Sequence, residues 1–71
     1  MKFLLTLVMC SGLAGECRVA DGYPIPKPDY ATCLLDGLVE SHTFITNNFS
    51  YEQIETLQLI PKYTCTEITT L

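Results

Sequence analysis

Met1–Ala14 has the sequence MKFLLTLVMCSGLA. Lys2 supplies a positive charge, Phe3–Cys10 forms a short apolar run, and the small residues Gly12 and Ala14 follow it. This order is typical of a secretory signal peptide that is cleaved after Ala14. The alternative interpretation is a buried N-terminal helix. The apolar run is well short of the ~20 residues that a membrane-spanning helix needs, so we expect no membrane span.

The signal-peptide interpretation divides the chain into three parts. Residues 1–14 are the predicted signal peptide, residues 15–29 an extended arm rich in proline, and residues 30–71 a small disulfide-closed domain. We therefore expect a secreted, extracellular protein whose cysteines meet an oxidising environment. A domain this small buries only ~60% of the surface that its unfolded chain exposes, so it depends on disulfides for stability.

The four cysteines lead to two predictions. Cys33 and Cys65 enclose nearly all the apolar positions of the domain, so we predict that they form the structural disulfide. Closing a loop of this length stabilises the folded state by roughly 3.7 kcal/mol in the chain-entropy model. Cleavage after Ala14 would leave Cys17 unpaired near a new N-terminus, where it could link two chains into a disulfide-bonded homodimer. Cleavage after Cys17 is the alternative, and it would remove that thiol with the signal peptide.

The arm contains a regular proline pattern. Asp21-Gly22 is a turn signal, and Tyr23–Pro28 has the sequence YPIPKP, with proline at every second position. Proline fixes its own φ and keeps the preceding residue out of the helical region, which favours a polyproline II conformation. Such an arm can dock into an aromatic groove of a partner, and a stiff spacer is the alternative. The candidate partner-contact residues are Tyr23, Pro24, Ile25 and Pro26.

Residues 30–71 are predicted to form a small α+β fold with one or two short helices and a C-terminal strand. A helix is predicted over residues 30–42, where Leu34, Leu35, Leu38 and Val39 recur at helical spacing after the candidate caps Asp29 and Thr32. The β-branched and aromatic residues at 43–46 favour a strand. Ser50 and Gln53 form a capping box for a second helix over residues 51–60, with a strand as the alternative because Leu57 and Leu59 alternate. Pro61 ends either element, and residues 62–71 suit a strand.

Several classes of function are not expected. The chain has a net charge of −4 and no cluster of basic residues, which argues against a nucleic-acid partner. His42 is the only histidine and is adjacent to Ser41 in the chain, an arrangement that does not form a nucleophile–base pair, so we expect no enzyme. No paired cysteine spacing indicates a metal site, and no cofactor is expected. Asn48-Phe49-Ser50 is an N-glycosylation sequon, which predicts a glycan on Asn48 in a eukaryotic secretory pathway.

Residues 19–25, VADGYPI, lie close behind the predicted signal peptide and resemble the start of scorpion long-chain sodium-channel toxins. The resemblance extends loosely to Cys33-Leu34-Leu35 and to a last cysteine at Cys65. It implies that Cys33 and Cys65 match the outer disulfide of that family, and that the protein acts on a channel. The chain has neither the C-x3-C nor the C-x-C motif of the family. Tyr63-Thr64-Cys65 also resembles the Tyr-x-Cys of an immunoglobulin strand.

We therefore predict a small secreted protein that binds an extracellular protein or receptor, such as a component of venom or another exocrine secretion. The alternative is a spacer, or a remnant of a cysteine-rich precursor, without a binding activity of its own.

Overall fold

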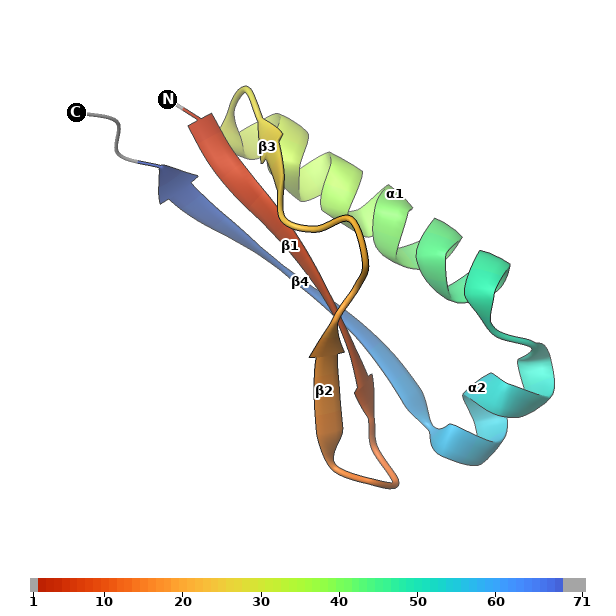
Figure 1. Ribbon diagram of the computed structural model, residues 1–71. Coiled ribbons are helices and arrows are strands. Elements are labelled where there is room, and N and C mark those ends of the chain that lie inside the picture. Colours follow the sequence, from red (N-terminus) through yellow and green to blue (C-terminus); the bar gives the residue numbers. More distant parts are fainter. Residues whose placement is uncertain (1, 69–71) are drawn as a thin grey trace.

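The computed structural model describes residues 2–68, which form a four-stranded antiparallel sheet with two helices (Figure 1). The small disulfide-stabilised α+β fold is therefore confirmed. Helix α1 lies along one face of the sheet, and α2 connects it to the last strand. The elements in chain order are β1 (Lys2–Ser11), β2 (Glu16–Val19), β3 (Ile25–Lys27), α1 (Tyr30–Asn48), α2 (Tyr51–Leu57) and β4 (Leu59–Ile68).

Strand β1 is the centre of the sheet and pairs with all three other strands. On one side it pairs with β4 along its whole length, from Lys2 opposite Ile68 to Ser11 opposite Leu59. On the other side the start of β1 pairs with β3, and the end of β1 pairs with β2. These two short strands form one interrupted edge, because the amide of Ala20 still donates to the carbonyl of Leu7 at 2.8 Å before residues 21–24 loop out.

The apolar run of the predicted signal peptide forms β1 in this structure. Leu5 and Leu7 are 0% and 1% exposed and are the best-buried leucines of the sheet. A short continuous apolar run suits a strand with neighbours on both edges, and here it is not a buried helix. A chain cleaved after Ala14 would lack β1. Removal of the signal peptide and formation of this sheet therefore exclude each other.

The β1–β2 hairpin contains a disulfide that the sequence analysis did not predict. Cys10 and Cys17 are directly opposite each other in the register of the hairpin and are bonded to each other. Gly15 takes a φ of 71° in the turn, a value that glycine adopts without steric cost. In this structure Cys17 is not unpaired, because its thiol is used within the hairpin. The disulfide-bonded homodimer requires cleavage after Ala14 and stays a prediction.

Helix α1 begins where the sequence predicts and continues further. Asp29 is the N-cap, and its carboxylate accepts a hydrogen bond of 2.7 Å from the amide of Thr32. The prediction of a strand at residues 43–46 is wrong, because these residues belong to α1. Ile45 explains the difference: it is buried beneath the helix, and this tertiary packing outweighs a weak local preference for strand.

The second helix and the last strand follow the sequence pattern, with shifted bounds. Ser50 and Gln53 form the predicted capping box of α2, which ends at Gln58 in the left-handed region with φ 52°. Strand β4 then begins at Leu59 and includes Pro61. Proline is tolerated there because β4 is an edge strand, where one side of the backbone needs no sheet partner. The predicted strand at residues 62–71 is present as far as Ile68, and its last three residues lie outside the described range.

The face of α1 that packs on the sheet consists mainly of small side chains. Its buried residues recur every four positions and are Cys33, Gly37, Ser41 and Ile45. Cys33 is bonded to Cys65 of β4, and the hydroxyl of Ser41 donates to the carbonyl of Gly37 at 2.6 Å. A Cβ at Gly37 would overlap the ring of Tyr63, so glycine allows the helix to approach β4 closely.

We expect Gly37→Ala to destabilise the protein by about 1–3 kcal/mol, the usual effect of overpacking a close contact. The sign of this change in stability is informative because, without the contact with Tyr63, alanine would stabilise a helix interior by ~1 kcal/mol relative to glycine. Urea unfolding measures the change, and Thr43→Ala on the exposed side of the same helix is the control. A Gly37→Ala variant as stable as the wild type would show that Tyr63 does not limit the approach of α1.

Candidate functional site

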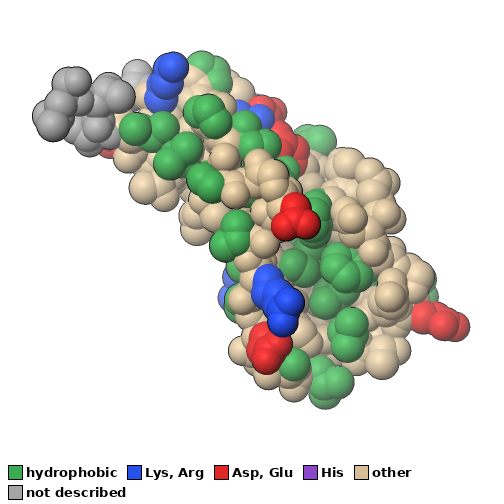
Figure 2. All heavy atoms as spheres, viewed as in Figure 1, with side chains coloured by type: hydrophobic (Ala, Val, Ile, Leu, Met, Phe, Trp, Pro, Cys, Tyr) green, Lys and Arg blue, Asp and Glu red, His purple; other side chains and the backbone are tan. Residues whose placement is uncertain are grey.

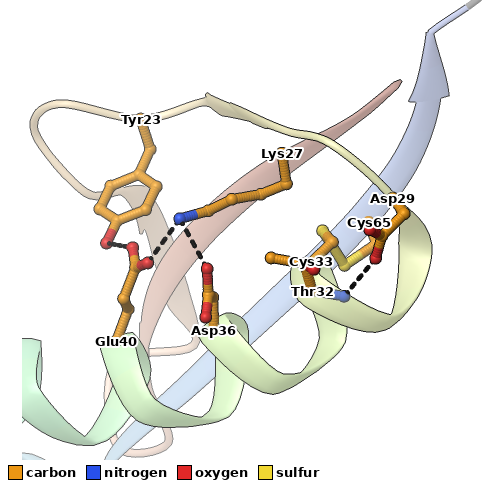
Figure 3. A network of polar contacts seen from close by, with 8 residues as sticks. All are labelled: Tyr23, Lys27, Asp29, Thr32, Cys33, Asp36, Glu40 and Cys65. Atoms are coloured by element: carbon orange, nitrogen blue, oxygen red, sulfur yellow. Dashed lines mark hydrogen bonds and ion pairs between the residues drawn. A yellow bond between two sulfur atoms is a disulfide. The ribbon is translucent and has the colours of Figure 1, made fainter. Parts of the chain in front are cut away.

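A network of polar side chains joins the β3 edge to α1 (Figure 3). The hydroxyl of Tyr23 donates to Glu40 Oε1 at 2.6 Å, and Lys27 Nζ donates to Glu40 Oε2 at 2.8 Å. Lys27 also lies 3.1 Å from Asp36 Oδ2. Two residues of the predicted arm thus meet two acids on one side of α1, and the network holds the arm against the helix.

The network raises the pKa values of Tyr23 and Lys27. Burial, and then the hydrogen bond to Glu40, raise the pKa of Tyr23 to about 12. The hydrogen bonds to Glu40 and Asp36 raise the pKa of Lys27 above its ordinary value. Tyr23 therefore stays protonated and Lys27 stays charged over the physiological range. Neither group is poised to transfer a proton, so the network has a structural role.

This network predicts a loss of stability in alkaline solution. The folded protein retains the protons of Tyr23 and Lys27 to higher pH than the unfolded chain does, so its stability falls as the pH rises. For Tyr23 the fall spans the interval from its ordinary pKa of 10.0 to about 12. We expect Tyr23→Phe to lose less stability over this interval than the wild type, as urea unfolding would show. In a pH titration, the tyrosinate absorbance of the wild type should contain a component near pH 12 that the variant lacks. If the absorbance of both proteins titrates alike, the hydrogen bond to Glu40 is not formed in solution.

The four candidate partner-contact residues of the arm do not form one surface. Tyr23 is engaged with Glu40, and Ile25 is half-buried opposite Leu5 in the sheet. Only Pro24 and Pro26 are exposed. The arm is extended as predicted, but it is part of the sheet and is tied to α1, so it is not a free polyproline segment.

The remaining predicted residues have clear positions. Cys33 and Cys65 form the disulfide that the sequence predicts, and it ties α1 to β4 beneath the helix (Figure 3). Asn48 is exposed at the last residue of α1, where its Nδ2 donates to the carbonyl of Phe44 at 2.8 Å. An exposed sequon at a helix end is compatible with a glycan, and glycosylation stays a prediction. His42 is exposed, and within residues 2–68 no group of three potential metal ligands is found.

Four large aliphatic side chains of α1 face solvent. We name these residues the α1 apolar surface; they are Leu34, Leu35, Leu38 and Val39. Leu35, Leu38 and Val39 are 61%, 56% and 64% exposed. Their helical spacing is evident from the sequence, but the direction in which they point is not. A second stripe of α1, made mainly of small residues at every fourth position, could have indicated this direction. Small side chains allow close packing on a sheet, so this stripe marks the buried side of the helix.

A pocket of about 560 Å³ lies between the β1–β2 hairpin and the helices, at the end of α1. Most of its lining is apolar and includes the side chains of Met9, Val19, Phe44, Phe49, Leu57 and Leu59. Hydrophobic side chains gather on this part of the molecule, with basic and acidic side chains to one side of them (Figure 2). Sequence reasoning did not predict the pocket, because its residues come from separate segments and share no motif.

No protein-family model, curated protein or solved structure matches this chain. The resemblance to scorpion toxins thus stays a prediction. Among the helices of the described residues, none has the length and apolar character needed to cross a membrane.

Proposed function

We propose that this protein is a small secreted binding protein that presents the α1 apolar surface to an extracellular protein. The two disulfides support an oxidising location, since such bonds persist outside the cytosol and are rare within it. Each disulfide stabilises one part of the scaffold. One closes the hairpin, and the other holds α1 on the sheet.

The observation that carries the proposal is the exposure of large apolar side chains on one helix. Leu35, Leu38 and Val39 have the spacing with which an amphipathic helix enters the groove of a partner. Contiguous apolar surface of this kind on a small monomer indicates an interaction site. The helix is also held rigid, because Cys33 is bonded to β4 and Glu40 is held by the arm. A rigid helix loses little conformational entropy on binding.

The surroundings of this surface favour a partner that contributes apolar contacts. Thr43 and Thr46 continue the exposed side of α1 without charge, and the acids Asp36 and Glu40 are already paired with Lys27. Residues 19–25, which carry the main resemblance to a scorpion toxin, lie elsewhere and extend from the end of β2 to the start of β3. Only the looser part of the resemblance, at Leu34 and Leu35, falls on α1, so the proposed contact is not on residues 19–25.

The test is competition for saturable binding to intact cells. Labelled wild-type protein is displaced by unlabelled protein, and we expect the triple variant Leu35→Ser, Leu38→Ser and Val39→Ser to compete about 100-fold less well. The matched control is Val19→Ser with Ile60→Ser, which removes exposed apolar side chains from the sheet. Equal competition by the triple variant would contradict the proposal. Absence of any saturable binding would favour the alternative of a spacer.

A further inference from the structure

We propose that the pocket at the end of α1 binds a small, uncharged, apolar organic molecule. The pocket shares no residue with the α1 apolar surface, so this site is independent of the proposed protein contact. Its volume of about 560 Å³ lies within the usual range for sites that enclose small ligands. Three features of the pocket favour such a ligand: its aromatic wall, its satisfied polar groups and the charge of its rim.

The aromatic wall is formed by two phenylalanines where α1 ends. The rings of Phe44 and Phe49 have centroids 6.5 Å apart and an interplanar angle of 60°, an edge-to-face arrangement. This pair fixes the orientation of both rings while they still line the pocket. Val19 of β2 and Leu57 of α2 add aliphatic surface from two other elements. Such a lining suits a flat apolar molecule, which contacts both ring faces and methyl groups.

The polar groups beside the apolar lining are satisfied within the protein. The hydroxyl of Ser11 donates to the carbonyl of Leu57 at 2.8 Å and accepts from the amide of Ala14 at 3.2 Å. The amide of Gly12 donates to the carbonyl of Gln58 at 2.8 Å. No buried side-chain nitrogen or oxygen of the described residues lacks a partner. Apart from the charged side chains of the rim, a ligand therefore meets few unpaired donors or acceptors, and its binding depends on apolar contact.

The charge of the rim disfavours an anionic ligand. Arg18 is the one cation that lines the pocket, and Glu16 and Asp21 line it as well. The two carboxylates outnumber the guanidinium, and the whole chain carries a net charge of −4. An anionic head group would thus approach a site of net negative charge. This balance favours an uncharged molecule over a fatty acid or another organic anion.

The experiment compares two fluorescent probes with related ring systems on the oxidised full-length chain. N-phenylnaphthylamine is uncharged, and anilinonaphthalene sulfonate carries an added negative charge. We expect the uncharged probe to bind with a single site per chain and the sulfonate to bind at least tenfold more weakly. Val19→Ser and Leu57→Ser should each weaken binding of the uncharged probe about tenfold. Leu35→Ser removes an exposed leucine outside the pocket and should leave binding unchanged.

The outcomes separate the pocket from non-specific binding. Circular dichroism establishes that each variant retains the wild-type secondary structure, and a variant that does not is replaced by the milder Val19→Ala or Leu57→Ala. Failure of the uncharged probe to bind, or equal binding by the pocket variants, would overturn the proposal. Equal affinity for the two probes would overturn the charge argument. Loss of binding with Leu35→Ser would assign the probe to the α1 apolar surface.

Discussion

A chain that lacks residues 2–14 should not form this sheet. Strand β1 is the hydrogen-bonding partner of β2, β3 and β4, so its removal leaves these strands without neighbours. It also removes Leu5 and Leu7, and burying each leucine stabilises the fold by about 1.5–3 kcal/mol. A protein of this size has a total stability of about 4–10 kcal/mol, so the loss removes most of it. The measurement is amide chemical-shift dispersion and circular dichroism of the oxidised truncated and full-length chains.

Point variants separate this effect from a general intolerance to change near the N-terminus. Leu5→Ala should cost about 2–5 kcal/mol, because it leaves a cavity between the sheet and α1. Leu13→Ala in the hairpin turn should cost almost nothing, since Leu13 is 66% exposed. A truncated chain with the dispersed spectrum of the full-length protein would show that β1 is dispensable.

The presence or absence of β1 in the exported protein shows whether the predicted signal peptide is removed. Intact mass of the exported protein distinguishes a chain that begins at Gly15 from one that retains β1. Cleavage after Ala14 before the Cys10–Cys17 disulfide forms would separate the two cysteines and leave the free thiol that the sequence predicts. A product with both disulfides intact requires that Cys10 be retained. The mass therefore reports the cleavage and the disulfide state together.

The features that were predictable from the sequence depend on short-range chemistry. Asp29 and the Ser50–Gln53 capping box mark the starts of the two helices, because a cap uses residues three positions apart. The Cys33–Cys65 disulfide was predictable because the loop between them encloses most of the apolar residues. The residues of each cap lie close together in sequence, and the disulfide joins two members of a residue type that is rare in the chain.

The features that were not predictable depend on tertiary context. A continuous apolar run after Lys2 is the same pattern in a signal peptide and in a central strand, so local sequence does not separate them. Similarly, α1 carries a stripe of leucines and a stripe of small residues. Its packing face is determined by Cys33 and by the contact of Gly37 with Tyr63. The pocket depends on the three-dimensional placement of three strands and two helices and leaves no local pattern.

Loss of the Cys33–Cys65 disulfide should be the most damaging change that leaves the backbone complete. The chain-entropy model gives about 3.7 kcal/mol for its loop of 32 residues. The Cys10–Cys17 loop spans 7 residues and gives about 2.4 kcal/mol, so its removal is the matched comparison. Urea unfolding of the two double alanine variants should show the larger fall in midpoint for Cys33→Ala with Cys65→Ala. Cys33 is fully buried, and the cavity left by alanine adds to the difference.

This disulfide also links stability to the proposed binding. It is the covalent tie between α1 and the sheet, and the arm adds only the surface contacts of Lys27 and Tyr23. Without it, α1 must be ordered when a partner binds, which lowers affinity even where the chain is still folded. We therefore expect the Cys33→Ala with Cys65→Ala variant to compete more weakly for the partner than the Cys10→Ala with Cys17→Ala variant. A reversed order would show that the hairpin, and not α1, forms the binding surface.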